Sequence, residues 1–233
     1  MLEEAALEIP DVLPDPAPMA MLTSYNESSI TYSLEVCCQE VEHANGLADE
    51  ILARVWYVSR RQGFTMPNPT SVLASALPSS EGHVPDRERH CLQALHNSLF
   101  AKLPPAVLRK LANSFPVRSY GAAELVLHQG TPVRELSLIL QGEAELLGQS
   151  PGGSSPLTVG ILVPGECFGE SVAQLRKASS QTTVRARTDL LLLQIDTDSL
   201  ASLTDQHPYL TRELHAVGEL RRQAMASLQR ELV

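Results

Sequence analysis

The sequence contains no apolar run of the 18–20 or so residues that a membrane-spanning helix needs. Its first four residues, Met1 to Glu4, include two acidic side chains and are not typical of a secretory signal peptide. We therefore expect the chain as given to be cytoplasmic.

An excess of positive charge is also missing. The 27 acidic residues outnumber the 18 basic ones, which gives a net charge of -9. General nucleic-acid binding requires a basic face that neutralises phosphates, so we expect no nucleic-acid partner. The balance does not exclude a single local site for an anion.

Cysteine and histidine are sparse, and neither forms a recognisable cluster. The four cysteines include no C-x-x-C pair, and the adjacent Cys37 and Cys38 would point to opposite faces of a strand. We interpret all four as reduced thiols. The seven histidines occur singly, and no Ser-His-Asp, Cys-His or metal-ligand set is visible. We expect no catalytic residues, no metal and no cofactor.

The 233 residues are enough for one or two domains. Residues 74–86 have the Pro, Ser and Gly content of a linker, which predicts one domain over residues 1–73 and another over residues 87–233. The first domain reads as helix, strand, strand, helix and an extended segment over residues 64–73. Its first helix is predicted over Leu2 to Glu8.

Two patterns predict which side chains of the first domain are buried. Four apolar residues alternate with polar ones as on a strand with one buried face, namely Ile30, Tyr32, Leu34 and Val36. A helical stripe follows, made by Leu47, Ile51, Val55 and Val58 and widened by Leu52 and Trp56.

Three phrases of this domain carry a resemblance: IPDVLPDPAP from Ile9, SSITY from Ser28, and WY…RRQGFTMPNP from Trp56. They resemble the cytoplasmic C-terminal α/β domain of small-conductance mechanosensitive (MscS-like) channels, here of the bacterial cyclic-nucleotide-gated type. The resemblance implies a ferredoxin-like domain that lacks its first strand. It also implies that the chain corresponds to the tail of a longer channel at the cytoplasmic face of the inner membrane, and that it forms a homo-oligomer.

In the second domain, seven or eight short strands separated by turn residues follow Val117 and predict a barrel or jelly roll. Asp196 to Ser199 is typical of a helix N-cap, and Pro208 precedes a long amphipathic helix. Between the strands, residues 165–170 read GECFGE. These two Gly-Glu pairs predict a tight turn that opens a short helix, where backbone N–H groups attract an anion such as phosphate.

The hairpin LSLILQGEAEL from Leu136, the GECFGE turn and the phrase TVRART from Thr183 resemble a cyclic-nucleotide-binding domain. The resemblance covers about residues 92–225 and implies a jelly-roll β barrel with flanking helices, so the fold class expected for the chain is α+β. It implies that Gly169 allows a close approach, that Glu170 binds the ribose 2′-hydroxyl, and that the amides of Ser171 and Val172 face the phosphate.

One position departs from that family. The arginine that would pair with the phosphate is replaced by Ser180, which is followed by Gln181 and Thr182. A serine hydroxyl can replace one hydrogen bond but none of the charge. Arg176 and Lys177 lie in the preceding loop, whereas Arg185 and Arg187 match ordinary strand positions.

The expected function is that of a non-enzymatic regulatory module that senses a cyclic nucleotide, cAMP or cGMP with cAMP as the first candidate. In a longer chain it would modulate an MscS-like channel together with other channel subunits. Leu214, Val217 and Leu220 are candidates for an apolar lid over the base, although core packing and dimer contact stay open for each. The alternative is a degenerate domain that serves in assembly without a ligand.

Overall fold

The computed structural model describes residues 1–25, 29–38, 44–64, 84–149, 156–173 and 179–231. The chain divides into two compact units, residues 1–79 and 80–233, and each is described by itself. The predicted linker lies mostly outside the described residues. The prediction that residues 84–86 belong to this linker was wrong, because helix α3 begins at Val84 rather than at residue 87.

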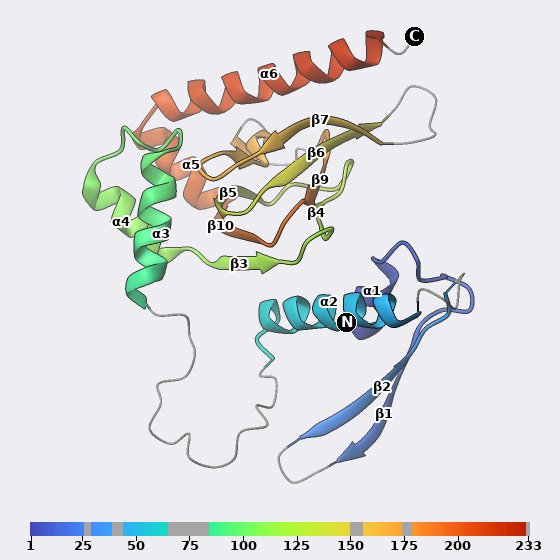
Figure 1. Ribbon diagram of the computed structural model, residues 1–233. Coiled ribbons are helices and arrows are strands. Elements are labelled where there is room, and N and C mark those ends of the chain that lie inside the picture. The colour runs from blue at the N-terminus through green and yellow to red at the C-terminus, as the bar shows by residue number, and fades with distance from the viewer. Residues whose placement is uncertain (26–28, 39–43, 65–83, 150–155, 174–178, 232–233) are drawn as a thin grey trace. The chain divides into compact units, whose positions relative to one another are not determined.

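The first unit contains two helices and a β-hairpin (Figure 1). Helix α1 (Leu2–Leu7) is followed by strands β1 (Met19–Tyr25) and β2 (Ile30–Glu35), which pair antiparallel, and by helix α2 (Ala44–Arg61). The extended segment expected over residues 64–73 lies, from residue 65, outside the described residues.

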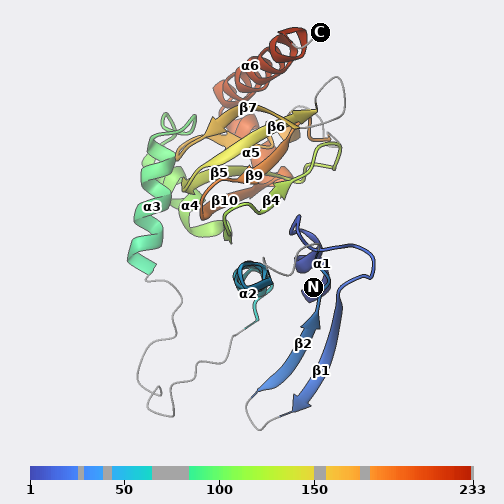
Figure 2. The ribbon, with the colours of Figure 1, turned by 45° about the vertical axis from the view of Figure 1, so that its right-hand side comes forward.

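The core of this unit is small and uses only part of the predicted apolar faces. Ile9, Val12, Leu47 and Ile51 are buried together, and Leu34, Val36 and Val55 pack against them. The expectation for Leu52 and Trp56 was wrong, because these side chains are 67% and 44% exposed. Ile30 and Tyr32 are exposed as well, since the outer half of the hairpin extends beyond the two helices (Figures 1 and 2).

The second unit begins with helices α3 (Val84–His96) and α4 (Pro105–Ser114) and ends with helices α5 (Thr197–Gln206) and α6 (Tyr209–Glu231). Between them lie strands β3 (Val117–Tyr120), β4 (Leu125–Leu127), β5 (Glu135–Gln141), β6 (Ala144–Gln149), β7 (Pro156–Leu162), β8 (Cys167–Phe168), β9 (Thr183–Ala186) and β10 (Leu190–Asp196), with the 3₁₀ helix η3 (Glu170–Ala173) after β8.

In the described residues these eight strands form two antiparallel four-stranded sheets, in the orders β3-β10-β5-β8 and β4-β9-β6-β7. The jelly-roll prediction is confirmed for this unit. The barrel is corrected to a sandwich, since no strand pairing between the described residues joins the two sheets.

Two apolar clusters show why β5 and β10 read as nearly continuous apolar runs. Alternate residues of a strand point to opposite faces. Thus Ile139 and Leu192 lie in the cluster between the sheets, whereas Leu138 and Leu193 lie in the cluster beneath the helices. Both strands are therefore buried on both faces.

The long helix α6 starts in that second cluster and continues along the sandwich beside β7 (Figures 1 and 2). Its N-terminal part is fixed by Leu210 and Leu214, which are fully buried. Helix α5 begins as predicted at an N-cap, where the Ser199 amide donates to the Asp196 carboxylate at 2.9 Å. Among the described residues, no helix is both long and apolar enough to span a membrane.

Candidate functional site

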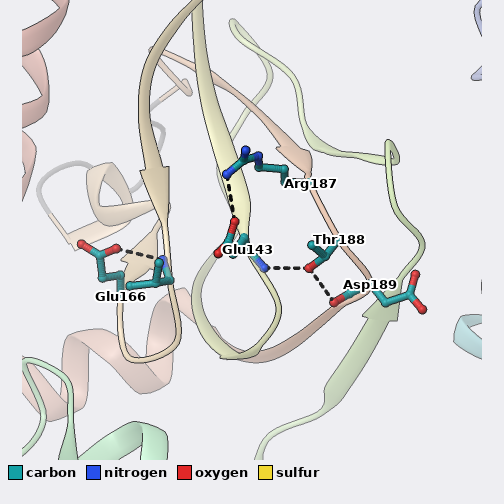
Figure 3. A network of polar contacts seen from close by, with 6 residues as sticks. Glu143, Glu166, Arg187, Thr188 and Asp189 are labelled. Atoms are coloured by element: carbon teal, nitrogen blue, oxygen red, sulfur yellow. Dashed lines mark hydrogen bonds and ion pairs between the residues drawn. The ribbon is translucent and has the colours of Figure 1, made fainter.

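The two Gly-Glu pairs of the central motif have different roles. At the first pair, Gly165 adopts a φ of +94°, and the Glu166 carboxylate accepts a hydrogen bond from the Val163 amide at 2.9 Å (Figure 3). The Gly165 amide also donates to the Ile139 carbonyl at 2.9 Å. The first pair therefore builds the turn and fixes it to β5.

The second pair lies where the chain leaves β8 and enters η3. Gly169 has a φ of +83°, and a Cβ atom placed there would lie 2.5 Å from the Glu135 carbonyl oxygen. The Glu135 backbone thus approaches Gly169 closely, while the expected close approach of a ligand there stays a prediction. Glu170 is the first residue of η3, and its side chain is 16% exposed.

A cavity of about 210 Å³ opens between this turn, the segment before β9 and helix α6. Six of the seven predicted site residues line it: Gly169, Glu170, Ser171, Ser180, Gln181 and Thr182. The seventh, Val172, belongs to η3, and its side chain lies outside the described part of the chain. The residues predicted from the sequence are thus gathered at one place, while their role in binding remains a prediction.

Helix α6 contributes residues that the sequence analysis did not identify. The lining residues that the sequence analysis missed in α6 are Gly218, Arg221, Arg222, Met225 and Ala226. Those missed in the rest of the unit are Leu127, Gln129, Phe168 and Val184. A signal was present, because positions 214, 218, 221 and 225 follow the three- and four-residue spacing of one helix face. The position of Leu214 in the core turns this face toward the sandwich.

The predicted lid residues do not line the cavity. Leu214 is fully buried in the core, and Leu220 is 67% exposed. Val217 is half-buried but is also absent from the lining. The part of α6 that lines the cavity begins at Gly218 and includes Met225 and Ala226 besides two arginines. Of the alternatives left open for the three candidates, core packing holds for Leu214.

Arg221 is the central group of the site. Its Nη1 donates to Glu170 Oε2 at 2.7 Å, and its Nη2 donates to the Cys167 carbonyl at 2.6 Å. Both partners of the ion pair are 16% exposed, so the pair is largely shielded from water. Burial raises the pKa of the adjacent Cys167 thiol to about 12, despite the opposing effect of Arg221.

Ser180 is 8% exposed, and its hydroxyl donates to the Thr182 carbonyl at 2.6 Å. Its amide donates to the Thr131 carbonyl at 2.9 Å, so the residue is also fixed to the segment between β4 and β5. Because a hydroxyl has one proton, Ser180 in this conformation has none left for a phosphate.

The other arginines of the motif region have structural partners. Arg185 donates to Glu145 at 2.6 Å, and Arg187 to Glu143 at 3.0 Å. The Glu143 amide also donates to the hydroxyl of Thr188, which forms a polar corner at the end of β9 (Figure 3). Neither arginine lines the cavity, as expected for strand positions. Arg176 and Lys177 lie outside the described residues.

Part of the second unit is similar to known proteins. Residues 117–207 match the family model of the cyclic nucleotide-binding domain. Over 108 residues the chain is 35% identical to a cAMP-dependent protein kinase regulatory subunit of Mycosarcoma maydis, a match that covers 46% of this chain and 20% of that protein. The chain thus spans about a fifth of the length of this relative.

Solved structures agree on the architecture. The regulatory domain of Toxoplasma gondii protein kinase A, crystallised with cAMP, matches with a TM-score of 0.51 and 15% identity over 58% of this chain and 51% of that one. A putative cAMP-binding regulatory protein from Silicibacter pomeroyi matches with a TM-score of 0.47 and 23% identity over 62% and 66% of the two chains. The family match and the likeness to the Toxoplasma gondii domain show that the second unit has the fold of a cyclic nucleotide-binding domain.

Proposed function

We propose that the second unit is a non-enzymatic regulatory module that binds a cyclic nucleotide, with cAMP as the ligand, in the cavity between the η3 turn and α6. The observation that carries the proposal is the arrangement of Glu170. Arg221 engages its Oε2 atom, and among the described residues Oε1 accepts no hydrogen bond. An oriented carboxylate oxygen in a cavity suits a sugar hydroxyl, which donates one proton.

The charge of the cavity supports an anionic ligand. Its lining side chains include two arginines and one glutamate, so the negative charge of Glu170 is outweighed by the positive charges of Arg221 and Arg222. The likeness of residues 117–207 to the cyclic nucleotide-binding domain and the 35% identity to the fungal regulatory subunit favour a cyclic phosphate over other anions.

Ligand binding would change the position or stability of α6. One wall of the cavity is made by α6 residues from Gly218 to Ala226, so a bound ligand contacts the docked helix and favours it over an undocked one. We propose that in a longer, MscS-like channel this shift acts through the first unit on ion flow. This part rests on the resemblance of residues 1–73 to the truncated ferredoxin-like domain of such channels, and it implies a homo-oligomer.

A second candidate function is an assembly module without a ligand. It is favoured by the fact that polar groups of the site already bind one another. Arg221 is paired with Glu170, and the Ser180 hydroxyl donates to the Thr182 carbonyl. Such a domain would keep its fold without any small molecule and could serve in assembly.

Isothermal titration calorimetry with cAMP and cGMP on the full chain separates the two. For wild type we expect cAMP binding. Glu170→Gln should weaken it roughly 10- to 100-fold, because a hydrogen bond to a charged group contributes about 1.5–3 kcal/mol and each 1.4 kcal/mol corresponds to tenfold. Glu143→Gln is the matched control, because Glu143 is also ion-paired with an arginine but lies outside the cavity.

Ser180→Arg adds the charge that the sequence lacks and should tighten cAMP binding by a similar factor. Binding by this variant alone would favour the assembly module. No binding by either protein, with unchanged circular dichroism, would reject the proposal.

A further inference from the structure

The cavity has cations on one side only in the described residues. The loop that carries Ser180 contributes neutral groups, namely Ser180, Gln181 and Thr182. The two arginines in the lining, Arg221 and Arg222, both come from α6. Among the described residues, a ligand phosphate therefore meets positive charge at the helix and not at residues 180–182.

The two arginines differ in how firmly they are held. The Arg222 side chain is 41% exposed and pairs with Glu219 of its own helix. The Arg221 guanidinium is 16% exposed and bridges two groups of the turn, Glu170 and the Cys167 carbonyl. A guanidinium fixed in this way loses little side-chain entropy when a ligand arrives.

Arg221 also has donors left for a ligand. A guanidinium carries five N–H donors, and the two bonds of Arg221 to Glu170 and to the Cys167 carbonyl use one each on Nη1 and Nη2. As far as the described residues go, three donors remain on a planar group that lines the cavity. A shielded guanidinium forms stronger bonds to a phosphate than an exposed one, because the charges are less screened.

We propose that Arg221 supplies the phosphate-binding charge of this domain, from α6 rather than from the loop before β9. The inference rests on the proposed function and identifies the residue of that site which recognises the anion. Its consequence is mechanical. The charge reaches the cavity only when α6 is docked, so a bound phosphate stabilises the docked helix, and a ligand without a phosphate lacks this contribution.

The test compares cAMP with adenosine, which keeps the base and the ribose but has no charge. Dissociation constants are measured for wild type, Arg221→Gln and Arg212→Gln. Arg212 is an exposed arginine of α6 outside the cavity, so its substitution makes the same change of charge on the same helix.

Arg221→Gln should weaken cAMP binding roughly 10- to 100-fold and adenosine binding less than threefold, because only cAMP loses a charge-assisted bond. Arg212→Gln should change both by less than threefold. Adding Ser180→Arg to Arg221→Gln should restore cAMP binding, which shows that the loss was one of charge and not of folding. Amide hydrogen exchange of α6 should slow with cAMP in wild type, and not with adenosine.

Each other outcome is distinguishable. Equal losses for both ligands would mean that Arg221 only orients Glu170, and unchanged affinities would mean that it does not act on the ligand at all. Either result overturns this inference and leaves the proposed function standing. A wild-type chain that binds neither ligand overturns the proposed function itself.

Discussion

Replacing Gly169 by alanine isolates the cost of one close backbone approach. The new Cβ would lie 2.5 Å from the Glu135 carbonyl oxygen, about 0.9 Å inside the shortest ordinary contact, and the obstacle is backbone that cannot rotate away. Gly130 is the matched control. It has the same φ of +83°, but no atom outside its chain neighbours would lie within 4 Å of a Cβ added there.

Both substitutions carry the same backbone strain. An alanine in the left-handed region costs about 1–2 kcal/mol, and a less flexible unfolded chain offsets about 0.4–1 kcal/mol of this. Gly130→Ala should therefore lose about 0.5–1 kcal/mol of the free energy of unfolding. Gly169→Ala adds about 1.5–3 kcal/mol for overpacking, which gives a total of about 2–4 kcal/mol.

Thermal unfolding followed by far-ultraviolet circular dichroism measures the difference. At roughly 2–4 °C per kcal/mol for a unit of this size, Tm should fall by about 4–15 °C for Gly169→Ala and by about 1–4 °C for Gly130→Ala. The fluorescence of Trp56, the single tryptophan, reports on the first unit and should not change. Equal losses for the two variants would refute the argument, because strain alone would then explain both.

Three further outcomes follow from other contacts. Asp196→Ala should lower the free energy of unfolding by about 1 kcal/mol at neutral pH. The hydrogen bond from the Ser199 amide lowers the pKa of Asp196, so this stabilisation is present above the unfolded-state pKa and is lost as pH falls through the folded-state pKa. Urea titrations at several pH values would show this dependence. A thiol reagent at pH 8 should label exposed Cys37 quickly and buried Cys167 only on unfolding, as peptide mapping by mass spectrometry would reveal. Arg185→Gln should cost at most about 1 kcal/mol in chemical denaturation and leave cAMP affinity unchanged, because its pair with Glu145 lies outside the cavity.

Each of these outcomes has a control or a contradicting result. Asp196→Asn keeps an acceptor for the helix amides and should lose much less stability than the alanine variant. Rapid labelling of the native Cys167 thiol would contradict its burial. A change of cAMP affinity in Arg185→Gln would show that the strand arginines reach the ligand.

Local regularities made much of the second unit predictable. Short strands between turn residues indicated the jelly roll, and the N-cap at Asp196 was recognisable because capping depends on neighbouring residues only. Gly165 and Gly169 could be identified as turn positions, since positive φ angles favour glycine. The division of the strands into two sheets was not predictable, because pairings such as β3 with β10 join segments about 70 residues apart.

In the first unit the helical stripe was predicted too wide. Leu52 and Trp56 continue the periodicity of Leu47 and Ile51, yet they are exposed because the neighbouring elements cover only one side of α2. Periodicity states which residues share a face. It does not state how much partner surface is available to cover that face.

By itself, the sequence predicted, through its resemblance to cyclic-nucleotide-binding domains, that residues 169–171 and 180–182 lie at one site, and these residues do line one cavity. It also showed that the position of Ser180 carries no charge. Only the tertiary structure placed Arg221, 41 positions later, beside Glu170 in the lining of the cavity. A helix 23 residues long can dock at many angles, and the burial of Leu210 and Leu214 selects the one that places Arg221 against Glu170.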